Sequence, residues 1–181
     1  NSKDDRFLIK EGLWKGKYLH DLYHQAMTPW EWHSEIARKA KENELVCFSS
    51  PFDETAVDFL ESLDVPAYKI ASFENNHLPL IHKAASTGKP LIISSGMASL
   101  AELEQAVRVA RDAGCNDLIL LKCTSNYPAS PVNTNILTIP HLKTLFQTEV
   151  GLSDHTMGLG VPLASIASVS YTHLTLPTKQ D

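Results

Sequence analysis

Polar residues able to do chemistry follow a series of short apolar runs along this chain. The set comprises mainly hydroxyl-bearing residues with lysines, carboxylates and a histidine: Ser49, Ser50, Lys69, Ser72, Glu74, Ser94, Ser95, Lys122, Thr124, Ser125, Tyr127, Ser153, Asp154 and His155. A lysine ammonium holds phosphate or carboxylate groups, and serine hydroxyls add neutral donors to the same anion. The pattern therefore indicates a binding site for a small anionic molecule.

Two lysines, Lys69 and Lys122, lie inside otherwise apolar runs. A buried ammonium is costly unless it has a partner. A ligand role would explain Lys69, which lies three residues before Ser72. An ion pair with a carboxylate such as Glu74 is the open alternative, and the indication of a ligand role is weaker for Lys122.

His155 follows Ser153 and Asp154 at the end of the last apolar run. Imidazole is a common metal ligand, and Asp154 offers a carboxylate that would orient or tune it. A single histidine also fits an ordinary hydrogen-bonded side chain, and the other seven histidines show no HExxH spacing.

The elements that must position these residues alternate along the chain. Apolar runs at 45–48, 67–72, 90–96, 118–124 and 149–154 predict strands, and helical patterns separate them at 53–63, 78–86, 99–113 and 140–146. Such alternation predicts a parallel sheet covered on both faces. The units repeat about every 26 residues, which suits a TIM barrel or a doubly wound sheet.

The polar ends of the runs favour the barrel, because all carboxyl ends of barrel strands surround one site. Neither GxGxxG nor GxxxxGK[ST] occurs in the sequence. We therefore expect an α/β chain that forms a partial TIM (β/α)8 barrel, with about five of the eight strands present.

Composition limits the remaining classes. The chain has 181 residues, 43% of them hydrophobic, and a net charge of −5, which suits one globular domain and argues against a general nucleic-acid binder. No apolar run approaches a membrane span. The three cysteines form no CxxC pair, so we expect a reducing, cytoplasmic compartment, with Cys47 and Cys123 as buried inert thiols.

The residues at the run ends form motifs that resemble the sialic acid (nonulosonic acid) synthase family. The motifs occur in the family's order: TPWEWH at 28–33, FSSPF at 48–52, YKIASFE at 68–74, ISSGMA at 93–98, CTSNYP at 123–128 and GLSDHT at 151–156. The resemblance covers about residues 1–167. GLW at 12–14 and the residues before CTSNYP are most similar to the pseudaminic acid branch of that family.

This resemblance implies a PEP-dependent transferase that forms a carbon–carbon bond. It would condense phosphoenolpyruvate (PEP) with an open-chain 2,4-diacetamido-2,4,6-trideoxy-hexose, assisted by a divalent metal, Mn or Mg. The residues implied to hold PEP are Ser50, Lys69, Ser72, Ser94, Ser125 and Ser153. Ser125 stands where N-acetylneuraminate synthases carry Asn. Tyr127 would line the site, His155 would be one of two metal histidines, and Glu74 would hold water or move a proton.

The same resemblance implies parts that this sequence does not show. We expect residues 1–167 to be a truncated barrel containing the third to seventh strands, and residues 168–181 to be a non-native tail. The parent protein would be a homodimer, and the chain alone would be inactive because its metal site has one histidine instead of two.

Three alternatives remain open. The first is an N-acetylneuraminate or legionaminate synthase, which shares the site chemistry. The second is a related aldol-type PEP synthase acting on a sugar phosphate. The third is a non-catalytic barrel that binds PEP or a sugar. No nucleic-acid or membrane partner is expected in any of them.

Overall fold

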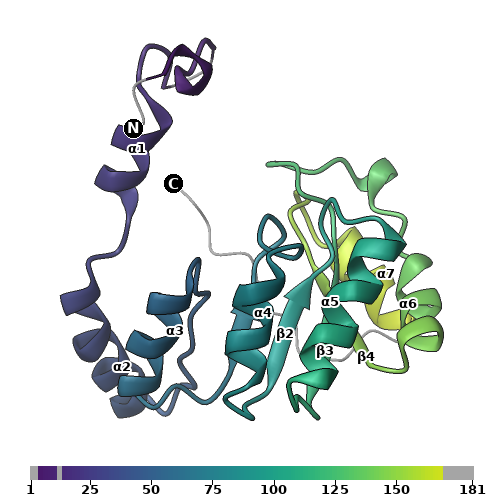
Figure 1. The fold of residues 1–181 in the computed structure, drawn as a ribbon. Coiled ribbons are helices and arrows are strands. Elements are labelled where there is room, and N and C mark those ends of the chain that lie inside the picture. Colours follow the sequence, from purple (N-terminus) through teal and green to yellow (C-terminus); the bar gives the residue numbers. More distant parts are fainter. Residues whose placement is uncertain (1–3, 12–13, 169–181) are drawn as a thin grey trace. The chain divides into compact units, whose positions relative to one another are not determined.

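The computed structural model of the chain describes residues 4–11 and 14–168 (Figure 1). The chain divides into two compact units, residues 1–45 and residues 46–181. The expected tail at 168–181 lies outside the described residues, apart from its first residue. Within the described ranges, no helix is long and apolar enough to cross a membrane.

In its described residues, 4–11 and 14–45, the first unit consists of short helices and has no buried side chain. Its elements are the 3₁₀ helices η1 (Asp5–Phe7) and η2 (Trp30–Trp32) and the α-helices α1 (Leu19–Ala26) and α2 (His33–Glu42). None of the residues in these four elements is buried. The side-chain contacts within these elements are local, such as the ion pairs from Arg38 to Glu35 and Glu42 on α2.

The second unit alternates strands and helices as the apolar runs predict. Its strands are β1 (Tyr68–Ile70), β2 (Leu91–Ser94), β3 (Leu118–Cys123) and β4 (Glu149–Ser153). Its helices are α3 (Glu54–Ser62), α4 (Leu78–Ala85), α5 (Leu100–Asp112), η3 (Pro131–Asn133), α6 (Thr138–Phe146) and α7 (Gly160–Ala167). The strands pair in the order β1-β2-β3-β4, all parallel.

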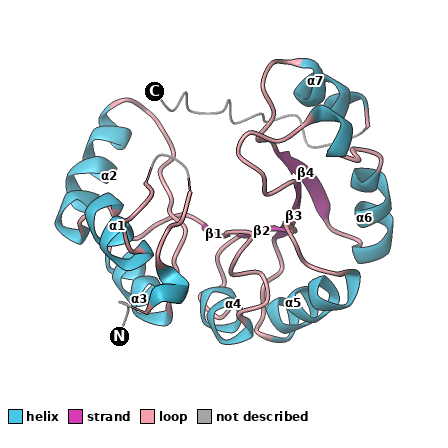
Figure 2. Ribbon diagram, turned by 90° about the horizontal axis from the view of Figure 1, so that it is seen from above, coloured by secondary structure: helices cyan, strands magenta, loops and turns pink. Residues whose placement is uncertain are grey.

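The sheet is curved, and the helices α4, α5 and α6 lie on its outer side (Figure 2). This arrangement is the expected α/β fold of a partial TIM barrel. One expected strand is wrong, however. Residues 45–48 form no strand, and the only pairing there is an isolated parallel bridge between Ser49 and Tyr68. Leu45 and Val46 are 66% and 77% exposed, so this apolar run gains little burial from extending the sheet.

The two faces of the sheet differ in character because successive side chains of a strand alternate between faces. The residues facing the helices are buried in the core: Tyr68, Ile70, Leu91, Ile93, Leu118, Leu120 and Val150. The inner face carries the alternate positions, which the register places in rows: Lys69 with Ile92 and Ile119, then Ser94 with Leu121 and Gly151, then Cys123 with Ser153. Reactive residues therefore share the inner face with aliphatic ones.

Gly151 leaves room on the inner face for its neighbour. A Cβ at this position would lie 2.9 Å from Cδ2 of Leu121 on β3. The Leu121 side chain thus occupies the space that any larger residue at position 151 would need.

The predicted capping box starts α5 directly after the loop that follows β2. Ser99 Oγ accepts a hydrogen bond from the Glu102 N–H (3.3 Å), and the Glu102 carboxylate accepts one from the Ser99 N–H (2.8 Å). Both bonds satisfy amide groups that the first helical turn leaves free. The box therefore fixes one end of the loop that follows Ser94, a residue of the candidate site.

Candidate functional site

All nine predicted site residues lie at the carboxyl ends of the strands. Lys69 lies within β1, while Ser94 and Ser153 are the last residues of β2 and β4. Ser50 follows the bridge at Ser49. The remaining five lie in the loops just after β1, β3 and β4: Ser72, Glu74, Ser125, Tyr127 and His155. Because the strands are parallel, these positions share one edge of the sheet.

Lys69 is a half-buried ammonium on the inner face of the sheet. Burial lowers its pKa, and the nearby Cys123 and Glu74 work in the opposite direction. Among the described residues, the ammonium has no hydrogen-bond partner and no carboxylate within ion-pair distance, so the alternative of a direct Lys69–Glu74 pair is not observed. A cation left in this state favours an anionic ligand.

Glu74 lies in the loop after β1 with a carboxyl group that is poorly solvated. Its Oε2 atom is buried and has no hydrogen-bond partner among the described residues. Burial raises the pKa of the carboxyl group, while its own backbone N–H, Lys69 and His77 lower it. A carboxyl group with a raised pKa is suited to carrying a proton during a reaction.

The serine hydroxyls of the site differ in their hydrogen-bond partners. Ser72 Oγ donates a hydrogen bond to the sulfur of Cys123 (3.3 Å), and Ser125 Oγ lies 3.7 Å from the same sulfur. Ser94 is only 1% exposed, and its hydroxyl has no partner in the described part of the chain. A buried hydroxyl without a partner is costly, so Ser94 has bonding capacity left for a ligand.

Sequence reasoning missed the parts played by Cys123 and Asn75. Cys123 is buried as predicted, but it also accepts a hydrogen bond from Ser72, 51 residues earlier. Asn75 is buried and donates to the backbone of the next strand. No local sequence pattern predicts either contact, because each joins the segment after β1 to the end of another strand. Cys47 is only half-buried, contrary to the prediction.

His155 lies against the ring of Tyr127, with ring centroids 4.3 Å apart and planes tilted by 50°. Burial lowers the pKa of the imidazole, Asp154 raises it, and Lys69 lowers it further. Asp154 does not orient the ring directly, because its Oδ1 accepts hydrogen bonds from the Thr156 N–H (3.0 Å) and hydroxyl (2.9 Å).

The divalent metal implied by the resemblance does not find a complete set of ligands here. Within residues 4–11 and 14–168, no group of three or more His, Cys, Asp and Glu side chains is placed to hold a metal ion. His155 is the metal ligand that the resemblance implies in this region, and the described residues around it do not complete a metal site.

Lys122 lies on the opposite face of the sheet from Lys69. Its neighbours in β3, Leu121 and Cys123, both lie on the inner face. Its ammonium donates to the Cys123 carbonyl (3.2 Å) and to Thr124 Oγ1 (2.9 Å). The two strand lysines thus differ in a way that spacing alone did not show: one has partners, and the other has none among the described residues.

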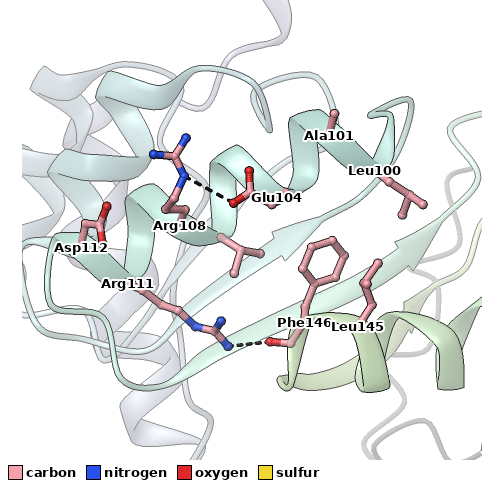
Figure 3. A pocket seen from close by; sticks show the side chains of 9 residues that line it. Leu100, Ala101, Glu104, Arg108, Arg111, Asp112, Leu145 and Phe146 are labelled. Atoms are coloured by element: carbon pink, nitrogen blue, oxygen red, sulfur yellow. Dashed lines mark hydrogen bonds and ion pairs between the residues drawn. The ribbon is translucent and has the colours of Figure 1, made fainter.

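A separate hollow of about 590 Å³ lies between α5 and α6, on the outer side of the barrel (Figure 3). Its lining includes Leu100, Arg108, Leu145 and Phe146, and Arg111 bonds the Phe146 carbonyl beside it (2.6 Å). No predicted site residue lines this hollow, so it is distinct from the strand-end site.

Comparison with known proteins identifies the family of this chain. Residues 1–179 match the sequence model of the NeuB family. This chain belongs to the NeuB family. The predicted resemblance to sialic acid synthases is therefore confirmed, and the motifs at the strand ends are those of a NeuB-family barrel.

Individual relatives show which members of the NeuB family this chain resembles. The chain is 47% identical over 163 residues to pseudaminic acid synthase of Helicobacter pylori, covering 90% of this chain and 48% of the relative. It is 43% identical over 167 residues to pseudaminic acid synthase of Campylobacter jejuni serotype O:2, covering 92% and 49%. The chain thus spans about half the length of the curated relatives it matches.

A solved structure agrees with the fold of this NeuB-family chain. N-acetylneuraminic acid (sialic acid) synthetase from Leptospira borgpetersenii, in complex with citrate, superposes with a TM-score of 0.79 at 30% identity. The superposition covers 83% of this chain and 52% of that one.

Proposed function

We propose that this chain supplies the PEP-binding part of a pseudaminic acid synthase, a transferase that joins PEP to an open-chain 2,4-diacetamido-2,4,6-trideoxy-hexose. The observation that carries the proposal is that, within residues 4–11 and 14–168, neither the half-buried Lys69 ammonium nor the Ser94 hydroxyl on the same inner face has a hydrogen-bond partner. Identity of 43–47% to two pseudaminic acid synthases supports the choice of reaction.

The chemistry of PEP matches these unsatisfied groups. PEP carries a phosphate and a carboxylate, and both need cationic or neutral donors in a half-buried site. Lys69 supplies the charge, and the hydroxyls of Ser50, Ser72, Ser94 and Ser153 supply neutral donors. Ser125 would be a further PEP-binding residue, and its serine in place of asparagine would contribute to the choice of sugar. Tyr127 would line the same site.

The proposed reaction balances as follows. The methylene carbon of PEP attacks the aldehyde carbon, which forms the new carbon–carbon bond, and the aldehyde oxygen takes up a proton. Water adds to C2 of the former PEP and loses a proton. The bond between C2 and the phosphate-ester oxygen then breaks as the C2 hydroxyl loses its proton and becomes the keto oxygen. The departing phosphate takes up a proton, which gives inorganic phosphate and the nonulosonic acid. Glu74 is the group proposed to carry a proton, because burial raises its pKa.

The divalent metal, the dimeric state and the cytoplasmic location belong to this proposal on family resemblance. His155 would be one metal ligand, and the others would come from outside the described residues. When bound, a divalent cation would polarise the aldehyde as a Lewis acid. No other part of the proposal depends on it.

The decisive experiment measures phosphate release from PEP by the protein expressed from its complete reading frame. We expect turnover with 2,4-diacetamido-2,4,6-trideoxy-altrose and none with N-acetylmannosamine. Turnover with N-acetylmannosamine or with a legionaminate precursor alone would replace the proposed substrate. PEP binding without phosphate release from any sugar would favour the non-catalytic binding protein. The 181-residue chain alone should bind PEP without turnover.

Titration of Lys69 gives a test that needs no sugar. Burial lowers the pKa of Lys69 below 10.5, so PEP affinity should fall as pH rises through that lowered pKa. The stability of the ligand-free chain should change in the opposite direction. The folded state disfavours the charged form, so stability rises across the same window and levels off above the unfolded pKa of 10.5.

Calorimetric titration with PEP and urea unfolding, from about pH 7 to about pH 11, would measure both trends. In a Lys69→Arg control, the affinity loss should move above this range because guanidinium stays protonated. An identical affinity profile in wild type and control would contradict the role of Lys69.

A further inference from the structure

On the side that faces β1, the end of β2 is held by a side chain in place of the backbone ladder. The last paired residues of β1 and β2 are Ile70 and Ile93. Beyond them, Asn75 Nδ2 donates to the Ser94 carbonyl (3.1 Å) and to the Ser95 carbonyl (2.7 Å). Asn75 is 4% exposed, so both hydrogen bonds are shielded from water.

The opposite side of the same turn shows what Asn75 replaces. The Ser95 N–H donates to the Leu121 carbonyl on β3 (2.8 Å), as a parallel ladder requires. The next donor along β3 is the Cys123 N–H, which a regular ladder would send to the Ser95 carbonyl. It donates instead to the Ser95 hydroxyl oxygen (3.2 Å). The carbonyl that Asn75 binds has therefore turned away from β3.

The turn at Ser94–Gly96 affects the positions of two hydroxyls of the candidate site, those of Ser94 and Ser72. Ser94, its first residue, carries the buried hydroxyl that has no partner in the described chain. Gly96, its third residue, packs so closely on Ser72 that a Cβ there would lie 2.3 Å from Ser72 Cβ and 2.6 Å from Ser72 Oγ. A shift of the turn by a fraction of an ångström would move Ser94 and change the room left for Ser72.

We propose that Asn75 is the positioning residue of the PEP site: its buried amide holds the Ser94–Gly96 turn so that the Ser94 and Ser72 hydroxyls face the same anion. The inference rests on the proposed function and deepens it. Asn75 need not touch PEP, since its effect passes through the carbonyls of Ser94 and Ser95.

The test compares Asn75→Ala with Asn76→Ala in the 181-residue chain. Asn76 is the adjacent residue of the same type, it is exposed, and its side chain makes no hydrogen bond with any described residue. PEP affinity is measured by calorimetric titration. We expect Asn75→Ala to raise Kd about tenfold, the scale of loss when a binding group is displaced without being removed. Asn76→Ala should leave Kd within about twofold, since most exposed changes are near neutral.

A double-mutant cycle with Ser94→Ala separates positioning from general loss of structure. If Asn75 acts through Ser94, Asn75→Ala should raise Kd by clearly less in the Ser94→Ala background, about threefold or less. Equal factors in both backgrounds would overturn the inference, as would an unchanged Kd in Asn75→Ala.

Amide hydrogen exchange covers the case in which binding cannot be measured. In Asn75→Ala, or in Asn75→Ser if the alanine variant unfolds, the Cys123 amide should lose protection while the Leu120 amide in mid-strand keeps it. Parallel loss at both amides, or no loss at Cys123, would overturn the positioning role. If wild type fails to bind PEP but the Cys123 effect appears, the proposed function fails and the hold on the turn stands.

Discussion

Replacing Lys69 by methionine is expected to weaken PEP binding by at least about 30-fold and to stabilise the ligand-free chain. Loss of one partner from a buried charge pair costs about 2–5 kcal/mol of binding, which corresponds to a factor of about 30 to a few thousand. The ammonium has no hydrogen-bond partner among the described residues, so the free chain loses no bond with it. Methionine also spares the cost of burying a charge, and we expect a gain of roughly 0.5–1 kcal/mol.

Lys122→Met is the matched control, since it makes the same lysine-to-methionine change in β3 of the same sheet. The Lys122 ammonium donates two hydrogen bonds and lies on the other face of the sheet. This variant should lose about 1 kcal/mol of stability and keep its PEP affinity within about twofold. Calorimetric titration and urea unfolding of both variants measure the contrast. A larger affinity loss in Lys122→Met than in Lys69→Met would reverse our assignment of the two lysines.

Substitution of Gly96 by alanine is expected to cost about 2–5 kcal/mol of stability and most of the affinity for PEP. The residue has φ +43, and its added Cβ would overlap the Ser72 side chain. The left-handed backbone contributes about 1–2 kcal/mol to the loss, and the overlap contributes about 1–3 kcal/mol more. Relief requires Ser72 or the turn to move, so surviving folded protein should bind PEP at least about tenfold more weakly.

Gly88→Ala separates these two causes. Gly88 also has a positive φ, +74, but a Cβ there would meet no atom within 4 Å. It should therefore lose only about 1–2 kcal/mol of stability through backbone strain and retain wild-type affinity for PEP. Urea unfolding and PEP titration distinguish the variants. Equal losses in both would mean that the contact between Gly96 and Ser72 has no consequence.

Local patterns were sufficient to predict most of the fold. The apolar runs at 67–72, 90–96, 118–124 and 149–154 all contain strands of the sheet, because buried parallel strands are apolar on both faces. The Ser99–Glu102 pattern marked the start of α5, since a capping box is formed by residues three positions apart. The run at 45–48 failed because hydrophobic residues alone do not supply a pairing partner or burial.

The site was only partly predictable for a related reason. Position at a strand end singled out Lys69, Ser94 and His155, because topology brings such ends together. The state of each group depends on contacts between distant segments, and these leave no local pattern. Spacing does not show that Lys122 has partners while Lys69 has none in the described part of the chain, or that the Asn75 amide donates to the turn after β2.

The close contact between Gly151 and Leu121 links the sizes of two residues that are 30 positions apart in the chain. Because the leucine already fills the space beside the glycine, alanine at 151 would require the Leu121 side chain to move or to be shorter. Across homologous sequences, the two positions should therefore covary in volume. A larger residue at the β4 position should be accompanied by a smaller one on β3, so that the inner wall of the barrel keeps its curvature through evolution.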